Sequence, residues 1–347
     1  MNQALNTSSE ARALERQAFV DDNWRLGANL QPLPADASAR RYFRVEGASL
    51  LLMDSPPDHE PLGPYVRVAG LLHGLGLSAP RVLAADEAAG LALIEDFGHA
   101  TYTRLLSAGH AEASLYELAV DCLVQLHTAP DETGAVLPAY DDRCLAEEFA
   151  LFIDWYAPLV LGKAPSSSLR SAYMALFAAL CDDVSACRET IVLRDFHVDN
   201  LMLLNGRDGV AACGLLDFQD ALHGACAYDL MSLLEDARRD IDPDLRATLL
   251  ERYLAQRSDI DSEAFLASYA VLAAQRHAKV LGIFVRLAQR DGKSGYLGHL
   301  PRVLRLFREA LERPALHPLR DFLDCHLNGW REELSVDTTD RLRIRQN

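Results

Sequence analysis

Near residue 98 the sequence changes from strand-like to helix-like, and this change limits the possible folds more than any other feature. Short aliphatic and aromatic runs bounded by turn residues predict strands at 41–45, 50–53, 81–85 and 91–95. Apolar spacing predicts helices at 9–24, 62–75, 111–128, 143–160, 167–185, 243–256, 262–290 and 301–330. A chain of 347 residues has room for two domains or lobes. We therefore predict an α+β fold with a β-rich lobe over 1–95, a hinge at 96–98 and a larger, mainly helical lobe over 99–347.

Two groups of short apolar runs, residues 190–204 and 211–218, interrupt the helical part and predict strands. They carry Asp195, Asn200 and Asp217. Phosphoryl transfer needs a carboxylate that orients the acceptor hydroxyl and accepts its proton, and it needs oxygen ligands that hold Mg2+ against the phosphates. Each of these residues alone is typical of a turn or a strand end, but the combination favours a kinase. We expect a hairpin joining the strands to bring all three within a few ångströms of one another.

This segment resembles the catalytic and metal-binding segments of the aminoglycoside phosphotransferase and choline kinase superfamily. Residues 193–200 read L-R-D-F-H-V-D-N, where the family pattern is roughly H-x-D-x-H-x-x-N. Residues 215–218 read L-L-D-F, where the family has I-D-F, and residues 228–230 match the family's following turn. The similarity covers about residues 30–320.

The resemblance implies a two-lobed, protein-kinase-like fold and an enzyme that uses ATP and Mg2+. It also implies that Asp195 is the catalytic base and that Asn200 and Asp217 are the magnesium ligands.

Two positions depart from the family pattern. Leu193 stands where the family has a structural histidine, and Met53 stands near the place of the third-strand lysine that grips the nucleotide phosphates. Other groups must then hold the phosphates, and backbone amides can do so in a suitable turn. The candidates are the turn at 36–39 with Ser38, and the arginines Arg40, Arg41 and Arg44. Surface charge beside a strand is the alternative for the arginines.

Residues 93–98, L-I-E-D-F-G, resemble the hinge of the family. The resemblance implies that Glu95 and Phe97 bind the adenine edge, mainly through main-chain groups. The alternative interpretation of residues 93–98 is an ordinary strand end followed by a turn.

Three stretches, at 36–44, 193–202 and 275–284, resemble one bacterial subgroup, the anomeric kinases of N-acetylmuramate and N-acetylglucosamine. This implies ATP-dependent phosphorylation of the C1 hydroxyl during cell-wall recycling, with an N-acetylated amino sugar as the small-molecule partner. The sequence does not rank the two sugars, nor ATP against GTP.

Three residues are candidates for binding the acceptor. Arg276 suits the lactyl carboxylate of N-acetylmuramate, although a solvated basic stripe is an equal alternative. His197 can touch the acceptor or brace the catalytic loop, and Asp220 can bind sugar hydroxyls or stabilise a turn.

Other functions remain open. An aminoglycoside kinase needs an acidic pocket, and a choline kinase needs an aromatic cage, for which the three widely spread tryptophans give no sign. The missing lysine leaves open a non-catalytic regulator with a kinase fold. A metal hydrolase using Asp195, His197 and Asp199 would leave Asn200 and Asp217 unexplained.

The composition narrows the partners. With 34 basic and 50 acidic residues, the net charge of −16 argues against a general nucleic-acid binder. No apolar run is long enough to span a membrane, and no export signal is evident at the start. Seven scattered cysteines without close pairs are typical of reduced thiols, so we expect a cytoplasmic protein.

Overall fold

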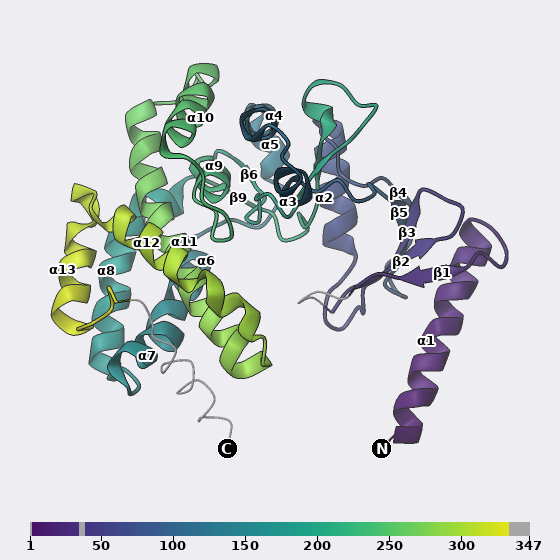
Figure 1. Ribbon diagram of the computed structural model, residues 1–347, viewed down its shortest axis with the longest axis horizontal. Coiled ribbons are helices and arrows are strands. Elements are labelled where there is room, and N and C mark those ends of the chain that lie inside the picture. The colour runs from purple at the N-terminus through teal and green to yellow at the C-terminus, as the bar shows by residue number, and fades with distance from the viewer. Residues whose placement is uncertain (1, 35–38, 333–347) are drawn as a thin grey trace. The chain divides into compact units, whose positions relative to one another are not determined.

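The computed structural model of the chain describes residues 2–34 and 39–332 (Figure 1). These residues form two compact units, each discontinuous in sequence. The first unit contains Met1–Leu126 and Val198–Asp220, and the second contains His127–His197 and Ala221–Asn347. The first unit thus continues beyond the predicted hinge and includes a later segment. The lobe boundaries at 96–98 stay a prediction.

The first unit is built on a five-stranded antiparallel sheet in the order β1-β2-β3-β5-β4. Its strands are β1 (Leu30–Pro32), β2 (Arg41–Val45), β3 (Leu50–Asp54), β4 (Val82–Asp86) and β5 (Leu91–Glu95). The four predicted strands are present, and only β1 was not predicted. The turn between β2 and β3 contains Gly47, whose positive φ of 73° suits a residue without a Cβ.

One face of this sheet is covered by the helix α1 (Asn2–Asn23), which lies beside β3 and β5 (Figure 1). The side chains of this face alternate with those of the other, as strand geometry requires. They form a core with Val20 of α1. The core includes Val45, Leu50, Leu52, Leu91 and Leu93, with Phe43 packed against them. Asp54, on the same face, pairs with Arg12 and Arg16 of α1.

The rest of the first unit is helical except for one hairpin. Its helices are α2 (Gly63–Gly74), α3 (Tyr102–Ser107) and α4 (Glu112–His127). The hairpin consists of β7 (Leu201–Leu203) and β8 (Cys213–Leu215), with a 3-10 turn, η2 (Gly209–Ala212), before β8. It is tied to the earlier part of the unit through Ser78. The Leu215 amide donates to the Ser78 carbonyl at 2.7 Å, and the Ser78 hydroxyl donates to the Ala211 carbonyl at 2.6 Å.

The second unit is mainly helical and is organised around α11 (Ser262–Asp291). Its other α-helices are α5 (Asp131–Gly134), α6 (Asp142–Leu151), α7 (Ala157–Leu161), α8 (Ser167–Ala186), α9 (Ala227–Leu234), α10 (Pro243–Gln256), α12 (Leu300–Leu311) and α13 (His317–His326). The 3-10 turns η3 (Ser294–His299) and η4 (Pro314–Leu316) flank α12. Two short strands, β6 (Thr190–Val192) and β9 (Leu222–Gly224), pair antiparallel.

Two predicted helices are interrupted. The segment predicted as 301–330 breaks after α12, where Pro314 cannot continue a helix. The segment predicted as 143–160 contains a π-helical turn, η1 (Phe152–Tyr156). The turn begins where α11 comes very close, because a Cβ added at Gly282 would lie only 2.2 Å from the Leu151 carbonyl oxygen. Close helix packing thus accompanies this interruption.

Among the described residues, no helix combines the length and the apolar character needed to cross a membrane. The seven cysteines are free thiols.

Candidate active site

The β7–β8 hairpin brings Asn200 and Asp217 to the same end of the first unit's small sheet. Leu201 pairs with Leu215, and the Leu216 amide donates to the Asn200 carbonyl at 2.9 Å. Asn200 and Asp217 therefore flank the last rung of the hairpin. This is the part of the predicted cluster that one hairpin does assemble.

Asp217 is exposed and held in an unusual backbone conformation, with φ of 57°. Such a conformation costs a non-glycine residue roughly 1–3 kcal/mol, so its surroundings must stabilise it. The Gln219 amide donates to Asp217 Oδ1 at 2.8 Å. Phe218 is buried, and its ring centroid lies 4.8 Å from that of Tyr65 on α2. These contacts fix the direction in which the carboxylate points.

The chemistry of this pair fits magnesium. Mg2+ favours one or two carboxylates and other oxygens, and it keeps several waters and substrate phosphates as ligands. Asn200 supplies an amide oxygen and Asp217 a carboxylate. In the part of the chain that the structure describes, no group of three or more His, Cys, Asp or Glu side chains forms a self-contained metal cage. A two-residue site completed by phosphates matches this donor set.

Asp195 lies in the second unit, in the loop after β6. Because β6 pairs with β9 and not with β7, the expectation that one hairpin carries all three residues is wrong. The pairing partner of β6 comes about 30 residues later in the chain, beyond the reach of local spacing rules. The Asp195 side chain is 45% exposed, so a substrate can reach its carboxylate.

Positive charges on α11 keep Asp195 ionised. Partial loss of hydration next to the surrounding protein raises the pKa of Asp195, but Arg276 and Lys279 outweigh this effect, and the pKa lies below its ordinary value. The Arg276 Nη2 atom is 3.9 Å from Asp195 Oδ1. Arg276 Nη1 donates to the Arg194 carbonyl at 3.0 Å and to the Tyr228 hydroxyl at 3.1 Å. The Arg276 side chain therefore contacts both the Asp195 carboxylate and the backbone of the loop that carries it.

Asp229 of α9 also holds the loop that carries Asp195. It is fully buried, and its two carboxylate oxygens accept from the amides of Leu193 at 2.6 Å and Arg194 at 2.9 Å. Arg194 has a positive φ of 70°, so the loop is strained just before Asp195. Burial raises the pKa of Asp229 to about 7, against the effect of its two backbone hydrogen bonds. The matching of residues 228–230 to the family located this residue without indicating its role.

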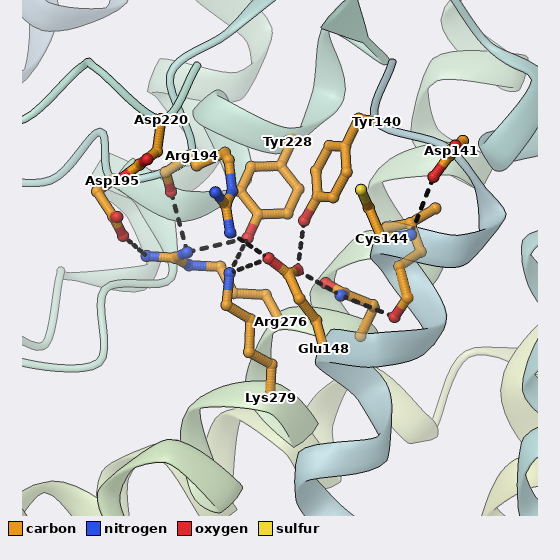
Figure 2. Close-up of polar contacts among 12 residues, drawn as sticks. Tyr140, Asp141, Cys144, Glu148, Arg194, Asp195, Asp220, Tyr228, Arg276 and Lys279 are labelled. Atoms are coloured by element: carbon orange, nitrogen blue, oxygen red, sulfur yellow. Dashed lines mark hydrogen bonds and ion pairs between the residues drawn. The ribbon is translucent and has the colours of Figure 1, made fainter. Parts of the chain in front are cut away.

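Beside Asp195 lies a buried charge network centred on Glu148 of α6 (Figure 2). Arg194 and Lys279 pair with Glu148 Oε1, the latter at 2.8 Å. Tyr140 and Gln275 donate to Glu148 Oε2 at 2.6 and 2.8 Å. Burial raises the pKa of Glu148, but the two cations overcome this effect and lower the pKa to about 2. The network thus ties Arg194, in the loop that carries Asp195, to α6 and α11.

The other residues predicted to bind the acceptor differ in exposure. His197 is buried, and burial together with the charge of Arg238 lowers its pKa well below the ordinary value, so the ring is neutral at pH 7. Asp220 is exposed, and the Gln219 amide lies 3.3 Å from its Oδ2. Burial favours bracing of the loop for His197. Direct contact with an acceptor stays a prediction for both.

The residues predicted to bind the nucleotide bases and phosphates have protein partners in the first unit. Glu95 pairs with Arg207, whose guanidinium lies 5.2 Å from the centroid of the Phe97 ring. Arg44 pairs with Asp96 at 2.6 Å. Arg41 is exposed. Ser38 lies outside the described residues, so its predicted role has no structural counterpart here.

The hairpin and the loop carry the types of residue that phosphoryl transfer uses. The chain belongs to the phosphotransferase enzyme family, whose model matches residues 29–267. A protein of Caulobacter vibrioides named N-acetylmuramate/N-acetylglucosamine kinase is 37% identical, and the match covers 92% of this chain and 98% of that protein. A protein of Pseudomonas aeruginosa with the same name is 39% identical, with 88% and 92% covered.

Solved structures show the same fold at low identity. A choline/ethanolamine kinase family protein of Mesorhizobium loti matches with a TM-score of 0.59 and 15% identity, covering 93% of this chain and 99% of that one. An aminoglycoside phosphotransferase in complex with GDP and kanamycin matches with a TM-score of 0.59 and 14% identity, covering 87% and 99%. The predicted α+β, protein-kinase-like fold and the predicted family are confirmed.

Proposed function

We propose that this protein is an ATP-dependent kinase that phosphorylates the anomeric C1 hydroxyl of N-acetylmuramate or N-acetylglucosamine. The observation that carries the proposal is the similarity to the Caulobacter kinase of both sugars over 92% of the chain. The residues that such a reaction needs, Asp195, Asn200 and Asp217, are all present. We also propose that the enzyme is cytoplasmic, because its cysteines are free thiols, as is usual in a reducing compartment.

In the proposed reaction the C1 oxygen forms a bond to the γ-phosphorus of ATP while the bond from that phosphorus to the β–γ bridging oxygen breaks. ADP leaves, and a sugar 1-phosphate remains. Asp195 orients the sugar hydroxyl and accepts its proton, which requires an ionised carboxylate. The lowered pKa of Asp195 supports this role. When bound, Mg2+ offsets the negative charge of the phosphates, and Asn200 and Asp217 are the residues that would hold it.

The contacts of Arg276 support a positioning role. It is buried, and it contacts Asp195, the Arg194 carbonyl and Tyr228. A guanidinium placed in this way keeps the carboxylate of Asp195 ionised and fixes the loop that carries it. Recognition of a lactyl carboxylate by Arg276 would compete with these contacts.

The test is ADP release by the purified protein with Mg2+ and ATP. N-acetylmuramate, N-acetylglucosamine, glucose, choline and kanamycin are compared as acceptors. We expect release with the N-acetylated sugars only, and a product whose phosphate is lost in mild acid, as a glycosyl phosphate is. ADP release only with choline or kanamycin would show that the acceptor is not an N-acetylated sugar. No release with any acceptor, together with no nucleotide binding, would favour a non-catalytic regulator.

A further inference from the structure

The lysine expected on the third strand has no counterpart on β3, and the residue near its place is Met53, which is fully buried. The strand register shows which cation lies nearest. Tyr42 of β2 pairs with Met53 and Arg41 pairs with Asp54. One residue beyond this pairing, the Arg40 Nε atom lies 3.2 Å from the Ser55 hydroxyl oxygen. Directly opposed residues in an antiparallel pair share a face, and so do residues two apart along a strand. Arg40, Tyr42, Met53 and Ser55 therefore lie on one face of the sheet.

This face is the one that α1 does not cover. Phe43 and Leu52 are on the opposite face, in the core with Val20 of α1. Arg41 shares that opposite face with Asp54, which pairs with residues of α1. Three arginines were considered as phosphate ligands. Arg41 lies on the face that α1 covers, opposite to the face that carries Met53. Arg44 is paired with Asp96 at the other end of β2. The arginine that remains beside Met53 is Arg40.

The Arg40 guanidinium is held in place by the carboxylate of Glu60. Its Nε atom lies 3.2 Å from Glu60 Oε2 and 3.2 Å from the Ser55 hydroxyl oxygen. The Ser55 hydroxyl donates to the Glu60 carbonyl at 2.5 Å, and the Ala39 amide donates to Glu60 Oε1 at 2.8 Å. The Arg40 side chain is only 7% exposed, so these contacts lie in a desolvated position where charge interactions are strong.

The surroundings of Arg40 connect it with the candidate magnesium ligand. Burial raises the pKa of the Tyr42 hydroxyl, Arg40 lowers it and Asp217 raises it, so both charges act on this hydroxyl. Arg40 also acts on Tyr65, whose ring contacts Phe218 next to Asp217. Within the first unit, the 4.8 Å contact between the Tyr65 and Phe218 rings joins α2 to the segment that carries Asp217.

We propose that the Arg40 guanidinium, anchored by Glu60, binds the phosphate groups of the nucleotide in place of the missing lysine. This inference rests on the proposed function, because it assumes a nucleoside triphosphate as phosphoryl donor. An arginine suits the task because its planar group carries five N–H donors, so it can hold a carboxylate and a phosphate together.

The experiment measures nucleotide binding without an acceptor, by calorimetry with Mg2+–ADP and, separately, with adenosine. We expect Arg40→Gln to weaken ADP binding about 10- to 100-fold, as loss of a charge-assisted phosphate contact does. Adenosine lacks phosphates, so its affinity should change by no more than about twofold. Arg40→Lys should retain more ADP affinity than Arg40→Gln. The control, Arg67→Gln, removes an exposed positive charge from α2 and should leave both affinities unchanged.

Two results would overturn the inference. The first is ADP binding by Arg40→Gln equal to that of Arg67→Gln, and the second is an equal loss of ADP and adenosine binding, which indicates a structural role. If Arg40→Gln does not fold, Glu60→Gln is measured in its place. We expect Glu60→Gln to lose ADP affinity and to keep its adenosine affinity. Unchanged ADP affinity in Glu60→Gln would contradict the proposal. Because no sugar is present, these outcomes are independent of which acceptor is used. Absence of nucleotide binding by the unmodified protein would remove this inference and the proposed function together.

Discussion

Asp195 combines an accessible carboxylate with a surrounding of buried positive charge. The exposed side favours contact with an acceptor, and Arg276 on the other side keeps the group ionised. Asp229 accepts hydrogen bonds from the amides of Leu193 and Arg194, and Arg194 has a positive φ, so Asp195 follows a strained backbone segment that Asp229 holds in place. At this scale, the environment of a single residue accounts for its proposed role as a base.

Replacing Asp195 by Asn tests that role. The amide has nearly the same shape but cannot accept the hydroxyl proton, so we expect kcat to fall about 100- to 10,000-fold. Nucleotide affinity should stay within about twofold, because the substitution leaves the candidate magnesium ligands in place. Steady-state kinetics and calorimetry measure the two effects. Unchanged kcat would remove Asp195 from the role of base.

Arg276→Gln tests the positioning role through the pH profile. Arg276 lowers the pKa of Asp195, so its removal raises that pKa, and the acid limb of the kcat profile should move to higher pH. Arg276→Lys keeps a positive charge and should give a smaller shift. Arg290→Gln, an exposed position on the same helix, is the control and should leave the profile unchanged. A fall in kcat by the same factor at every pH would instead indicate a purely structural role.

At the scale of elements, the interruption η1 shows how one helix influences another. The Leu151 backbone approaches α11 so closely that only glycine fits at position 282. The elements α11 and η1 are in extensive contact. A longer side chain at position 282 would push them apart. The packing of α6 and α11 in turn places Glu148 next to Lys279.

Gly282→Ala should therefore destabilise the protein. The added methyl group would meet the Leu151 carbonyl oxygen at 2.2 Å, and overpacking of this kind costs typically about 1–3 kcal/mol. Gly295→Ala is the matched control, since nothing lies within 4 Å of its added Cβ. Urea unfolding compares the two variants. Equal stability would show that α11 can move away from Leu151 without cost.

Local patterns predicted most regular elements and named the candidate residues for the reaction. The strands at 41–45 and 91–95 match the structure because alternation and turn signals lie within a few residues. Asp195, Asn200 and Asp217 were proposed as site residues from their short spacing, and their roles stay a prediction. The pairing of β6 with β9 and the contacts of Glu148 were not predicted, because they join segments far apart in the chain. The break at η1 was not predicted either, and the close approach that accompanies it involves Gly282 of α11, far away in the chain.

At the scale of the whole molecule, buried ionised groups couple folding to pH. Glu148 has a pKa of about 2 in the folded protein, below its ordinary value of 4.5. Its contribution to stability is therefore fully present above pH 4.5 and is lost as the pH falls toward 2. The difference amounts to about 3 kcal/mol, at about 1.4 kcal/mol for each pH unit.

Glu148→Gln should lower the free energy of unfolding by about 3–5 kcal/mol at pH 7, because it leaves two buried cations without their carboxylate. The gap between the variant and the unmodified protein should narrow as the pH falls below 4.5. Glu147→Gln, at an exposed neighbouring position on α6, should cost little at any pH. Urea unfolding at pH 7 and at a pH between 2 and 4.5 measures both variants. A gap that does not change with pH would contradict this origin of the stability.

The discontinuity of the first unit affects how the protein can fold during synthesis. The sheet of β1 to β5 leaves the ribosome early, but the β7–β8 hairpin that bonds to Ser78 is made only after α8 and β6. A nascent chain that ends before residue 220 thus lacks part of its first unit. The first unit therefore becomes complete only after residues 127–197 of the second unit have been synthesised.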